Sequence, residues 1–298
     1  MALGGASPDP GPAPADQTYS AWTAGKGAAP ELTDREFYDL CRLIHRHAGI
    51  QLSAQKKELV RSRLAKILRS RNLTSFAHYY QEVLADKTGG ELVSLLDAIS
   101  TNQTAFWREP AHFLFLAREV LPAWRRAMQK PWRFWSAGCA SGEEPYTLAM
   151  MLLETFGPQG LGGVKILASD LNTQVLAQAR QGVYSLERLA PLPPEWRRRY
   201  FQKGVNRFEG FARLKEEVRR LVEFIRLNFM EPFHFPEEFD VIFCRNVMIY
   251  FDRQNQQRLI RQFHQCLRPG GYLFIGHSES LCNINHPFTY VRPTIYQK

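Results

Sequence analysis

One segment constrains the fold of this chain most. In it, a short apolar run leads into a loop of small residues, and the loop leads into a helix. Residues 134–137 have the composition of a buried strand, residues 138–142 are all small, and a helical segment follows through residues 146–153. Glycine lets the backbone approach a ligand closely, and the first turn of a helix presents N–H groups without a partner inside the helix. The segment therefore predicts a ligand-binding strand–loop–helix unit.

The same alternation of short apolar segments and helices continues toward the C-terminus. We expect strands at residues 164–168, 239–244 and 271–276, and a helix at residues 173–180. Short apolar strands separated by helices are typical of a parallel sheet covered by helices on both faces. The expected fold class is therefore α/β, with a mostly parallel, Rossmann-like sheet.

Between about residues 185 and 224 this alternation breaks. Pro191, Pro193 and Pro194 prevent a continuous helix. Residues 211–224 then offer short alternating segments with interleaved charges. We expect an inserted subdomain here, with a small antiparallel sheet.

The N-terminal part has a different pattern. Residues 1–30 are rich in alanine, proline and glycine, and such a segment cannot bury enough apolar surface to offset its ordering entropy. It is predicted to be a flexible tail. Residues 31–100 show helical spacing, which begins with a capping box of Thr33 and Glu36. We expect a helical domain there, a linker at residues 101–118 and the α/β domain at residues 119–298.

The composition indicates the cellular compartment of the protein, but it does not identify the class of its partner. The five cysteines are scattered without C-x-x-C spacing, and no apolar stretch approaches the about 20 residues of a membrane helix. We therefore expect a cytoplasmic protein with reduced thiols, without membrane insertion and without a metal site. The net charge of +9 fits nucleic acid, an anionic membrane surface or an acidic protein.

Part of this charge is concentrated on the helix expected at residues 54–70. Leucine, isoleucine and valine gather on one side of this helix, among them Leu59, and Arg61, Lys66 and Arg69 lie on or near the other. Such a face is either ordinary solvated surface or a docking surface for an acidic partner.

Acidic residues accompany the predicted ligand loop. Glu143 and Glu144 open its helix, and Asp170 ends the next strand. The loop lacks the G-x-G-x-x-G pattern and the Walker lysine of phosphate-binding loops, and an acid at the end of that strand accepts hydrogen bonds from ribose hydroxyls. The combination predicts a ribonucleoside ligand that carries positive charge. S-adenosylmethionine fits this description, and an NAD-type ligand is the alternative.

Three longer segments show a resemblance to a known family. They are T-N-Q-T-A-F-W-R-E at residues 101–109, F-C-R-N-V-M-I-Y-F at residues 243–251, and L-R-P-G-G-Y-L at residues 267–273. Together with the glycine loop and Asp170, they closely resemble the chemotaxis receptor glutamate methyltransferases, the CheR family. The resemblance spans about residue 31 to the C-terminus, and the first two motifs are far more specific than a glycine loop.

The resemblance implies a fold, a reaction and a cofactor. Members of the family combine a helical N-terminal domain with a class I methyltransferase domain, into which a small antiparallel subdomain is inserted. They transfer the methyl group of S-adenosyl-L-methionine to glutamate side chains on the cytoplasmic methylation helices of chemoreceptors, and they release S-adenosyl-L-homocysteine. This reaction serves chemosensory adaptation, and it involves neither a metal nor nucleic acid.

The resemblance also implies roles for individual residues. Arg108 and Tyr250 would lie nearest the transferred methyl group, and Arg61, Lys66 and Arg69 would dock on the acidic receptor helices. Glu143 is the alternative to Glu144 as a cofactor contact. The residues that would hold the cofactor are Asn102, Thr104, Arg108, Gly138, Glu144, Asp170, Asn228, Phe229, Arg245 and Asn246.

The inserted subdomain resembles one that can grip a C-terminal tether of the receptor. Here Gly204-Val205-Asn206 stands where tether-binding members tend to carry G-x-G, which is a departure from the pattern. Two other functions share the fold. One is an RNA or small-molecule methyltransferase, and the other is a signalling scaffold that binds the cofactor without catalysis.

Overall fold

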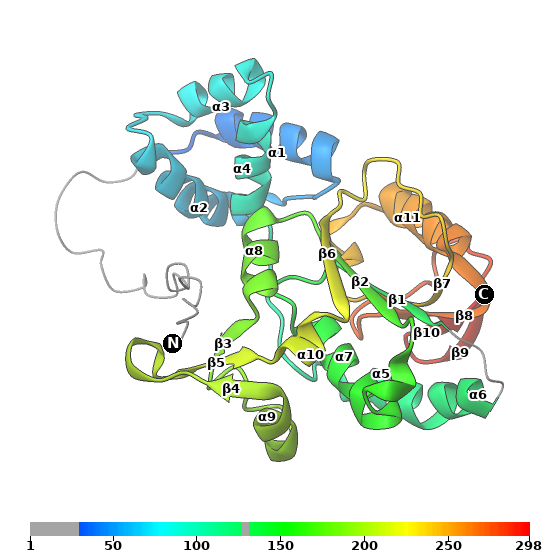
Figure 1. The fold of residues 1–298 in the computed structure, drawn as a ribbon. Coiled ribbons are helices and arrows are strands. Elements are labelled where there is room, and N and C mark those ends of the chain that lie inside the picture. The colour runs from blue at the N-terminus through cyan, green and yellow to red at the C-terminus, as the bar shows by residue number, and fades with distance from the viewer. Residues whose placement is uncertain (1–29, 127–130) are drawn as a thin grey trace.

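The computed structural model describes residues 30–126 and 131–298. They form a helical domain, an α/β domain and a small separate sheet (Figure 1). The tail expected at residues 1–30 lies outside the described residues, apart from Pro30. Within the described ranges, every helix is too short or too polar to cross a membrane.

The helical domain is a set of short helices around one apolar core. They are α1 (Asp34–Ala48), η1 (Ala54–Lys56), α2 (Lys57–Ser70), α3 (Phe76–Ala85) and α4 (Gly90–Ile99). The predicted capping box is confirmed, because the Glu36 N–H donates to the Thr33 hydroxyl at 3.2 Å and the Thr33 N–H donates to the Glu36 carboxylate at 2.9 Å. Leu40, Leu64 and Phe76 come from three of the helices and are fully buried together.

The α/β domain is built on a sheet that has seven strands in the described residues, in the order β6-β2-β1-β7-β8-β10-β9. The first five in this order run parallel, whereas β10 is antiparallel to both of its neighbours, β8 and β9. The predicted Rossmann-like sheet is confirmed. The strands are β1 (Arg133–Ala137), β2 (Lys165–Asp170), β6 (Val222–Arg226), β7 (Phe239–Cys244), β8 (Leu267–Ile275), β9 (Thr289–Arg292) and β10 (Ile295–Gln297).

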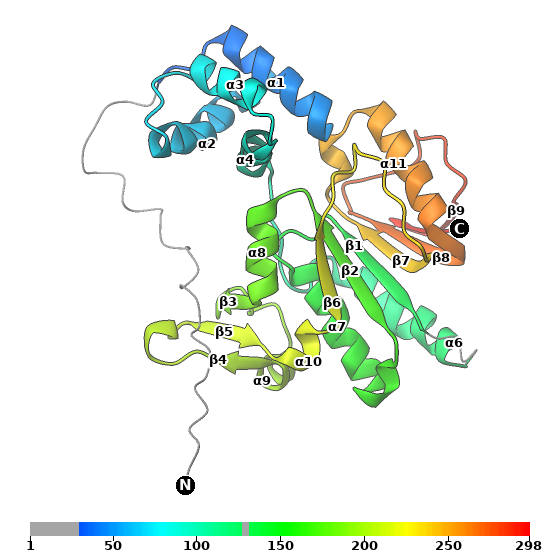
Figure 2. The same cartoon turned by 45° about the horizontal axis from the view of Figure 1, so that its top comes forward.

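Helices cover both faces of this sheet, since successive strand residues point to opposite sides. Phe134 belongs to the core beneath α7 (Glu143–Phe156), and Trp135 belongs to the core beneath α11 (Arg253–Cys266). Figure 2 shows α7 and α11 on opposite sides of the sheet. The remaining helices of this domain are α5 (Pro110–Phe115), η2 (Leu116–Val120), α6 (Leu121–Arg126), η3 (Gln159–Leu161), α8 (Thr173–Gln181) and η5 (Met248–Tyr250).

The order of the strands reverses beside β1. From β1 the chain proceeds outward through β2 and β6, and it then returns to the other side of β1 to form β7 and β8. In open α/β sheets, ligands bind at such a reversal, in the crevice beyond the carboxyl ends of the strands. The segments after β1, β2, β6 and β7 carry most of the residues that the resemblance assigns to the cofactor.

A separate three-stranded antiparallel sheet, in the order β3-β5-β4, confirms the expected small antiparallel sheet. Its elements are β3 (Val183–Ser185), α9 (Pro194–Tyr200), β4 (Phe201–Lys203), η4 (Asn206–Phe208), β5 (Phe211–Leu214) and α10 (Glu216–Arg219). The main-sheet strand β6 begins at Val222, inside the range expected for the insertion. Glu223 and Arg226 alternate with apolar residues on this edge strand, and the sequence pattern therefore resembled that of the small sheet.

The helical domain is attached to the α/β domain on two sides of the strand ends. On one side, the Thr173 N–H at the start of α8 donates to the Asp97 carboxylate of α4 at 2.8 Å. On the other side, the Gln51 N–H donates to the Tyr250 carbonyl at 2.8 Å. The helical domain therefore covers the crevice at the strand ends from both sides.

Candidate functional site

A cleft of about 830 Å³ lies between the helical domain and the carboxyl ends of the main-sheet strands. Three regions line it: residues between 48 and 63 of the helical domain, residues between 99 and 108 of the linker, and the loops that follow β1, β2, β6 and β7. The cleft therefore coincides with the reversal of strand order beside β1.

All residues that the resemblance assigns to the cofactor or to catalysis line this one cleft. They are Asn102, Thr104, Arg108, Gly138, Glu144, Asp170, Asn228, Phe229, Arg245, Asn246 and Tyr250. The residues of the expected docking face, Arg61, Lys66 and Arg69, do not line it.

Asp170 is held against the glycine loop. It is 8% exposed, and its carboxylate accepts hydrogen bonds from the Ala140 N–H at 2.8 Å and from the Asn172 N–H at 2.9 Å. Burial raises the pKa of Asp170, and these N–H groups oppose the rise. Each carboxylate oxygen retains acceptor capacity. Asp170 can therefore accept hydrogen bonds from ribose hydroxyls in the cleft.

The two glutamates at the start of α7 point to different regions. The Glu144 carboxylate accepts hydrogen bonds from the Ser136 hydroxyl and from Nε of Arg245, both at 2.6 Å, at the wall of the cleft. Glu143 is fully buried and pairs with Arg188, away from the cleft lining. Consecutive helical residues differ in direction by about 100°. Glu144 is therefore the glutamate that can contact a ligand.

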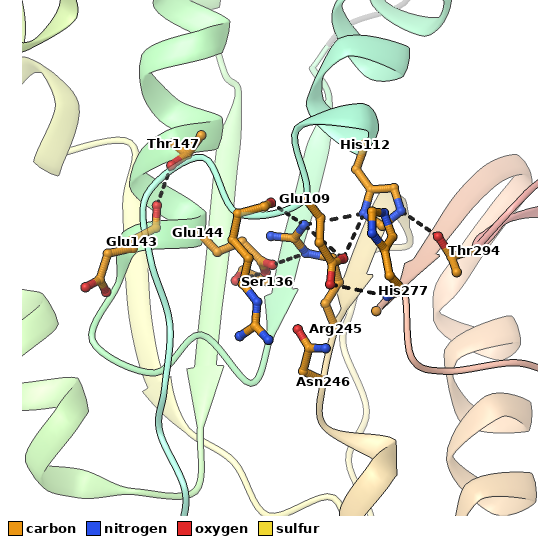
Figure 3. A network of polar contacts seen from close by, with 12 residues as sticks. Glu109, His112, Ser136, Glu143, Glu144, Thr147, Arg245, Asn246, His277 and Thr294 are labelled. Carbon is orange, nitrogen blue, oxygen red and sulfur yellow. Dashed lines mark hydrogen bonds and ion pairs between the residues drawn. The ribbon is translucent and has the colours of Figure 1, made fainter. Parts of the chain in front are cut away.

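Arg245 is a buried cation that connects several parts of the site (Figure 3). Its side chain is 3% exposed, and besides Glu144 it contacts the carbonyl of Arg108 at 2.7 Å. Its Nη1 also lies 3.4 Å from a carboxylate oxygen of Glu109 and 3.4 Å from Nδ1 of His112. These partners already surround the guanidinium. Arg245 therefore stabilises the structure of the site by holding its segments together.

Arg108 and Tyr250 have side chains available to a ligand. The Arg108 guanidinium donates to the Gln103 carbonyl at 2.9 Å. Within residues 30–126 and 131–298, no carboxylate forms an ion pair with Arg108, and the adjacent Glu109 pairs with Arg245 instead. A cationic group without a carboxylate partner therefore lies in the same cleft as Tyr250.

Asn228 and Asn246 differ in which of their side-chain atoms are left without a hydrogen bond. The Asn246 Oδ1 is buried without a hydrogen-bond partner among the described residues, and Asn246 adopts a φ of 59° while its N–H donates to Glu279. Asn228 instead donates to the His47 carbonyl at 2.7 Å and accepts from the Met230 N–H at 3.0 Å. Asn228 therefore connects the two domains, whereas Asn246 has an unused acceptor beside the cleft.

Charge is divided between two walls of the cleft. The acids Glu144 and Asp170 lie at the strand ends, and Lys56 and Arg63 line the wall of the helical domain. Arg63 donates to the Ser100 carbonyl at 3.1 Å, and it thereby holds the start of the linker. Lys56 and Arg63 were not predicted as cleft residues, because helical periodicity does not tell which polar side of a helix faces the other domain.

The expected docking residues lie elsewhere on α2. Lys66 and Arg69 are exposed, and Arg61 forms an ion pair with Glu58 at 2.9 Å. Leu59, expected on the apolar side of this helix, is 36% exposed and lines the cleft. The basic surface of α2 is therefore adjacent to the cleft rather than part of it.

A group of possible metal ligands adjoins Arg245. In the described part of the chain, ligand atoms of Glu109, His112 and His277 lie within 4.8 Å of one another. The guanidinium of Arg245 already approaches Nδ1 of His112 at 3.4 Å. A fixed positive charge at this distance opposes the binding of a metal cation, and we assign no metal to this group.

Comparison with known proteins gives a match in both domains. Residues 35–100 match the family model described as "CheR methyltransferase, all-alpha domain", and residues 102–297 match "CheR methyltransferase, SAM binding domain". The second match includes every cleft residue named above outside the helical domain.

Similar proteins match over most of their length. The "Chemotaxis protein methyltransferase" of Escherichia coli (strain K12) is 41% identical over 89% of this chain and 91% of its own. "Chemotaxis protein methyltransferase 2" of Pseudomonas aeruginosa is 43% identical over 89% and 93%. The "Chemotaxis protein methyltransferase" of Borreliella burgdorferi is 40% identical over 90% and 95%.

Replacing Gly138 with alanine should destabilise the protein. Gly138 has a φ of +87°, and a Cβ there would overlap the side chain of Val247. A positive φ costs alanine about 1–2 kcal/mol, and overpacking adds about 1–3 kcal/mol. Gly210→Ala is the matched control, since Gly210 has a φ of +86° with nothing within 4 Å of its Cβ position. In urea unfolding, Gly138→Ala should lose more stability than Gly210→Ala, and equal losses would contradict this account.

Proposed function

The chain belongs to the CheR methyltransferase family, and from this premise we propose that it transfers the methyl group of S-adenosylmethionine to glutamate side chains of chemoreceptors. The products are glutamyl methyl esters and S-adenosylhomocysteine. The names of the similar proteins place methyl transfer in chemotaxis. The glutamate carboxylate as acceptor is what the resemblance to this family implies, and the chemistry of the cleft supports it.

The cleft has groups that fit S-adenosylmethionine. Asp170 has acceptors for the ribose hydroxyls, and Glu144 retains lone pairs for an ammonium group beyond its bonds to protein atoms. The buried Oδ1 of Asn246 lacks a protein partner among the described residues, so a donor group of the ligand can satisfy it. Asn102, Thr104 and Phe229 complete the contacts. When bound, S-adenosylmethionine supplies a methyl group on a positively charged sulfur.

The observation that supports the substrate assignment is the guanidinium of Arg108, which forms no ion pair with a carboxylate among the described residues. A guanidinium binds a carboxylate through short, charge-assisted hydrogen bonds. Arg245 cannot take this role, because Glu144 and Glu109 already pair with it. Arg108 therefore offers an acidic side chain a partner within the cleft, and Lys56 on the opposite wall adds positive charge.

The residues of the cleft need to orient this substrate but not to activate it. A glutamate side chain has an unperturbed pKa of about 4.3, so it is already a carboxylate at neutral pH and no general base is required. Arg108 can hold one carboxylate oxygen and leave the other free to attack. Tyr250 can exclude water beside it, and such orientation and desolvation are effective contributions to catalysis.

We further propose that the small sheet binds a C-terminal tether of the receptor. β3 and β4 are its two edges, and an extended peptide can add to a sheet edge through main-chain hydrogen bonds. Asn206 has a φ of 53°, a conformation that glycine adopts readily and asparagine tolerates. The departure from G-x-G at Gly204-Val205-Asn206 is therefore compatible with the turn that a second glycine would form.

Incubation with methyl-labelled S-adenosylmethionine and receptor membranes should label the receptors, and base should release the label as methanol. Methyl esters hydrolyse in base, whereas methyl groups on nitrogen or carbon do not. Arg108→Ala should lower kcat/KM about 100-fold, because the carboxylate loses its orienting partner. Arg118→Ala, a change at an exposed arginine outside the cleft, is the control. Base-stable label, or label found in RNA, would contradict the proposal, and cofactor binding without transfer would indicate a scaffold.

Asp170→Asn should weaken the binding of S-adenosylhomocysteine by about 1–3 kcal/mol, since hydrogen bonds to a charged acceptor are lost. Asp240→Asn is the matched control. Asp240 is also a buried acid whose pKa is raised by burial, but it pairs with Arg268 and lies outside the cleft. Isothermal titration should show a higher Kd for Asp170→Asn and an unchanged Kd for Asp240→Asn. An unchanged Kd would remove Asp170 from the cofactor site.

Reversing the charges of Arg61, Lys66 and Arg69 should raise the KM for receptors several-fold at low salt, and less at high salt. The Kd for S-adenosylhomocysteine should stay unchanged. Reversal of Arg118, Arg125 and Arg126, which are exposed on η2 and α6, changes the net charge equally and is the control. Equal KM values would make the α2 face ordinary surface.

Receptors without their C-terminal segment should show a higher KM if the small sheet binds the tether.

A further inference from the structure

We propose that His112 is a positioning residue that accepts a hydrogen bond from Arg245 at Nδ1, and thereby fixes the arginine that connects Glu144 to the linker. This inference rests on the proposed function, because it assigns His112 a part in preparing the cofactor site. His112 lies on α5, within the linker expected at residues 101–118, and does not line the cleft. It therefore acts through Arg245 rather than by touching a ligand.

The first observation concerns the far side of the imidazole ring. Nε2 of His112 lies 2.7 Å from the hydroxyl oxygen of Thr294. The hydroxyl of Thr294 donates to the Pro293 carbonyl at 2.8 Å, so its hydrogen is already used and its oxygen must accept. The hydrogen between the two groups therefore belongs to Nε2 of His112.

The second observation concerns the near side of the ring. Nδ1 of His112 lies 3.4 Å from Nη1 of Arg245. A guanidinium has donors only, and it stays protonated in proteins. Nδ1 must therefore accept, which requires a neutral ring with its hydrogen on Nε2. The two sides of the ring thus lead independently to the same tautomer (Figure 3).

The surroundings of the ring favour this neutral form. His112 is 1% exposed, and its ring packs against Phe274 with centroids 5.4 Å apart. Burial, followed by Arg245 and His277, lowers the pKa of His112 to about 3. The charged and titratable groups that face the ring are Arg245, Glu109 and His277. The Glu109 carboxylate lies 3.6 Å from Nδ1, and it is the competing partner that would favour a hydrogen there.

The tautomer of His112 matters because Arg245, which it positions, binds two other segments of the site. Arg245 binds Glu144 at the start of α7 and the Arg108 carbonyl in the linker. The Nδ1 acceptor limits rotation of the guanidinium, and Thr294 in the turn between β9 and β10 limits rotation of the imidazole. The turn is itself attached to the main sheet, because the Ile275 N–H donates to the Thr294 carbonyl at 3.0 Å. The C-terminal hairpin thereby supports the cofactor site.

The first test determines the tautomer directly. The full chain, labelled with ¹⁵N at histidine, is studied at pH 7 by long-range ¹H–¹⁵N correlation, in which the two ring nitrogens of a neutral histidine have well-separated shifts. The signals of His112 are those lost in His112→Phe. We expect a hydrogen on Nε2 alone. A hydrogen on Nδ1, or on both nitrogens, overturns the proposal.

The second test separates positioning from packing. His112→Phe keeps an aromatic ring beside Phe274 but removes the acceptor, whereas His112→Asn leaves a cavity but keeps an acceptor near the position of Nδ1. His112→Phe should weaken the binding of S-adenosylhomocysteine about tenfold and lower kcat. His112→Asn should recover most of both losses. His264→Phe is the matched control, because His264 also packs edge-on against a phenylalanine, Phe288, but lies outside the cleft.

If His112 had a purely structural role, the order would be the opposite. His112→Asn would then bind S-adenosylhomocysteine more weakly than His112→Phe, because asparagine leaves a cavity. That order, or a Kd equal to that of the unmodified protein in both variants, would refute the positioning role. The binding of S-adenosylhomocysteine requires no receptor. If receptors failed to yield base-labile methanol, the proposed function would fail, while this test would still decide the role of His112.

Discussion

The buried ion pair between Glu144 and Arg245 is the interaction on which the rest of the site depends. Glu144 starts α7, Arg245 follows β7, and Nη1 of Arg245 also binds the Arg108 carbonyl in the linker, so one guanidinium joins three segments. Both residues are less than one tenth exposed. Removing one partner from such a pair costs about 3–5 kcal/mol, because a buried charge is left without compensation. The three segments that form the floor and edge of the cleft therefore cannot shift independently of one another.

The same pair determines which charges remain available to ligands. Glu144 and Glu109 compensate Arg245, whereas Arg108 in the linker has no acidic partner among the described residues. Asp170 remains at the end of β2 as an anionic acceptor. The cleft thus separates an acidic region at the strand ends from a basic region at the linker and at the wall of the helical domain. A transfer between a cationic donor and an anionic acceptor requires such a division, since each ligand must find its opposite charge without the two protein charges neutralising each other.

The sequence predicted the centre of this structure better than its edges. β1, β2, β7 and β8 were predicted because each contains a short apolar run, and all six residues of β7 are buried. The edge strands β6 and β9 have exposed, charged positions, and β10 has three residues, so none of them has the pattern of a buried strand. The cleft residues came from the family motifs, and the structure brings them into one place. The partnership of His112 with Thr294 had no signal in the sequence, because 182 positions separate the two residues.

The helical domain is part of the cofactor site as well as a surface beside it. Its Gln51 N–H binds the Tyr250 carbonyl, its His47 carbonyl accepts from Asn228, and its Asp97 carboxylate accepts from the Thr173 N–H at the start of α8. Thr173 directly follows Asn172, whose N–H donates to Asp170. These contacts reach the segments that follow β2, β6 and β7. A change in the position of the helical domain must therefore move the walls of the cleft. The linker with Arg108 lies between the helical domain and the strand ends, which is where we propose that the glutamate side chain meets the methyl donor.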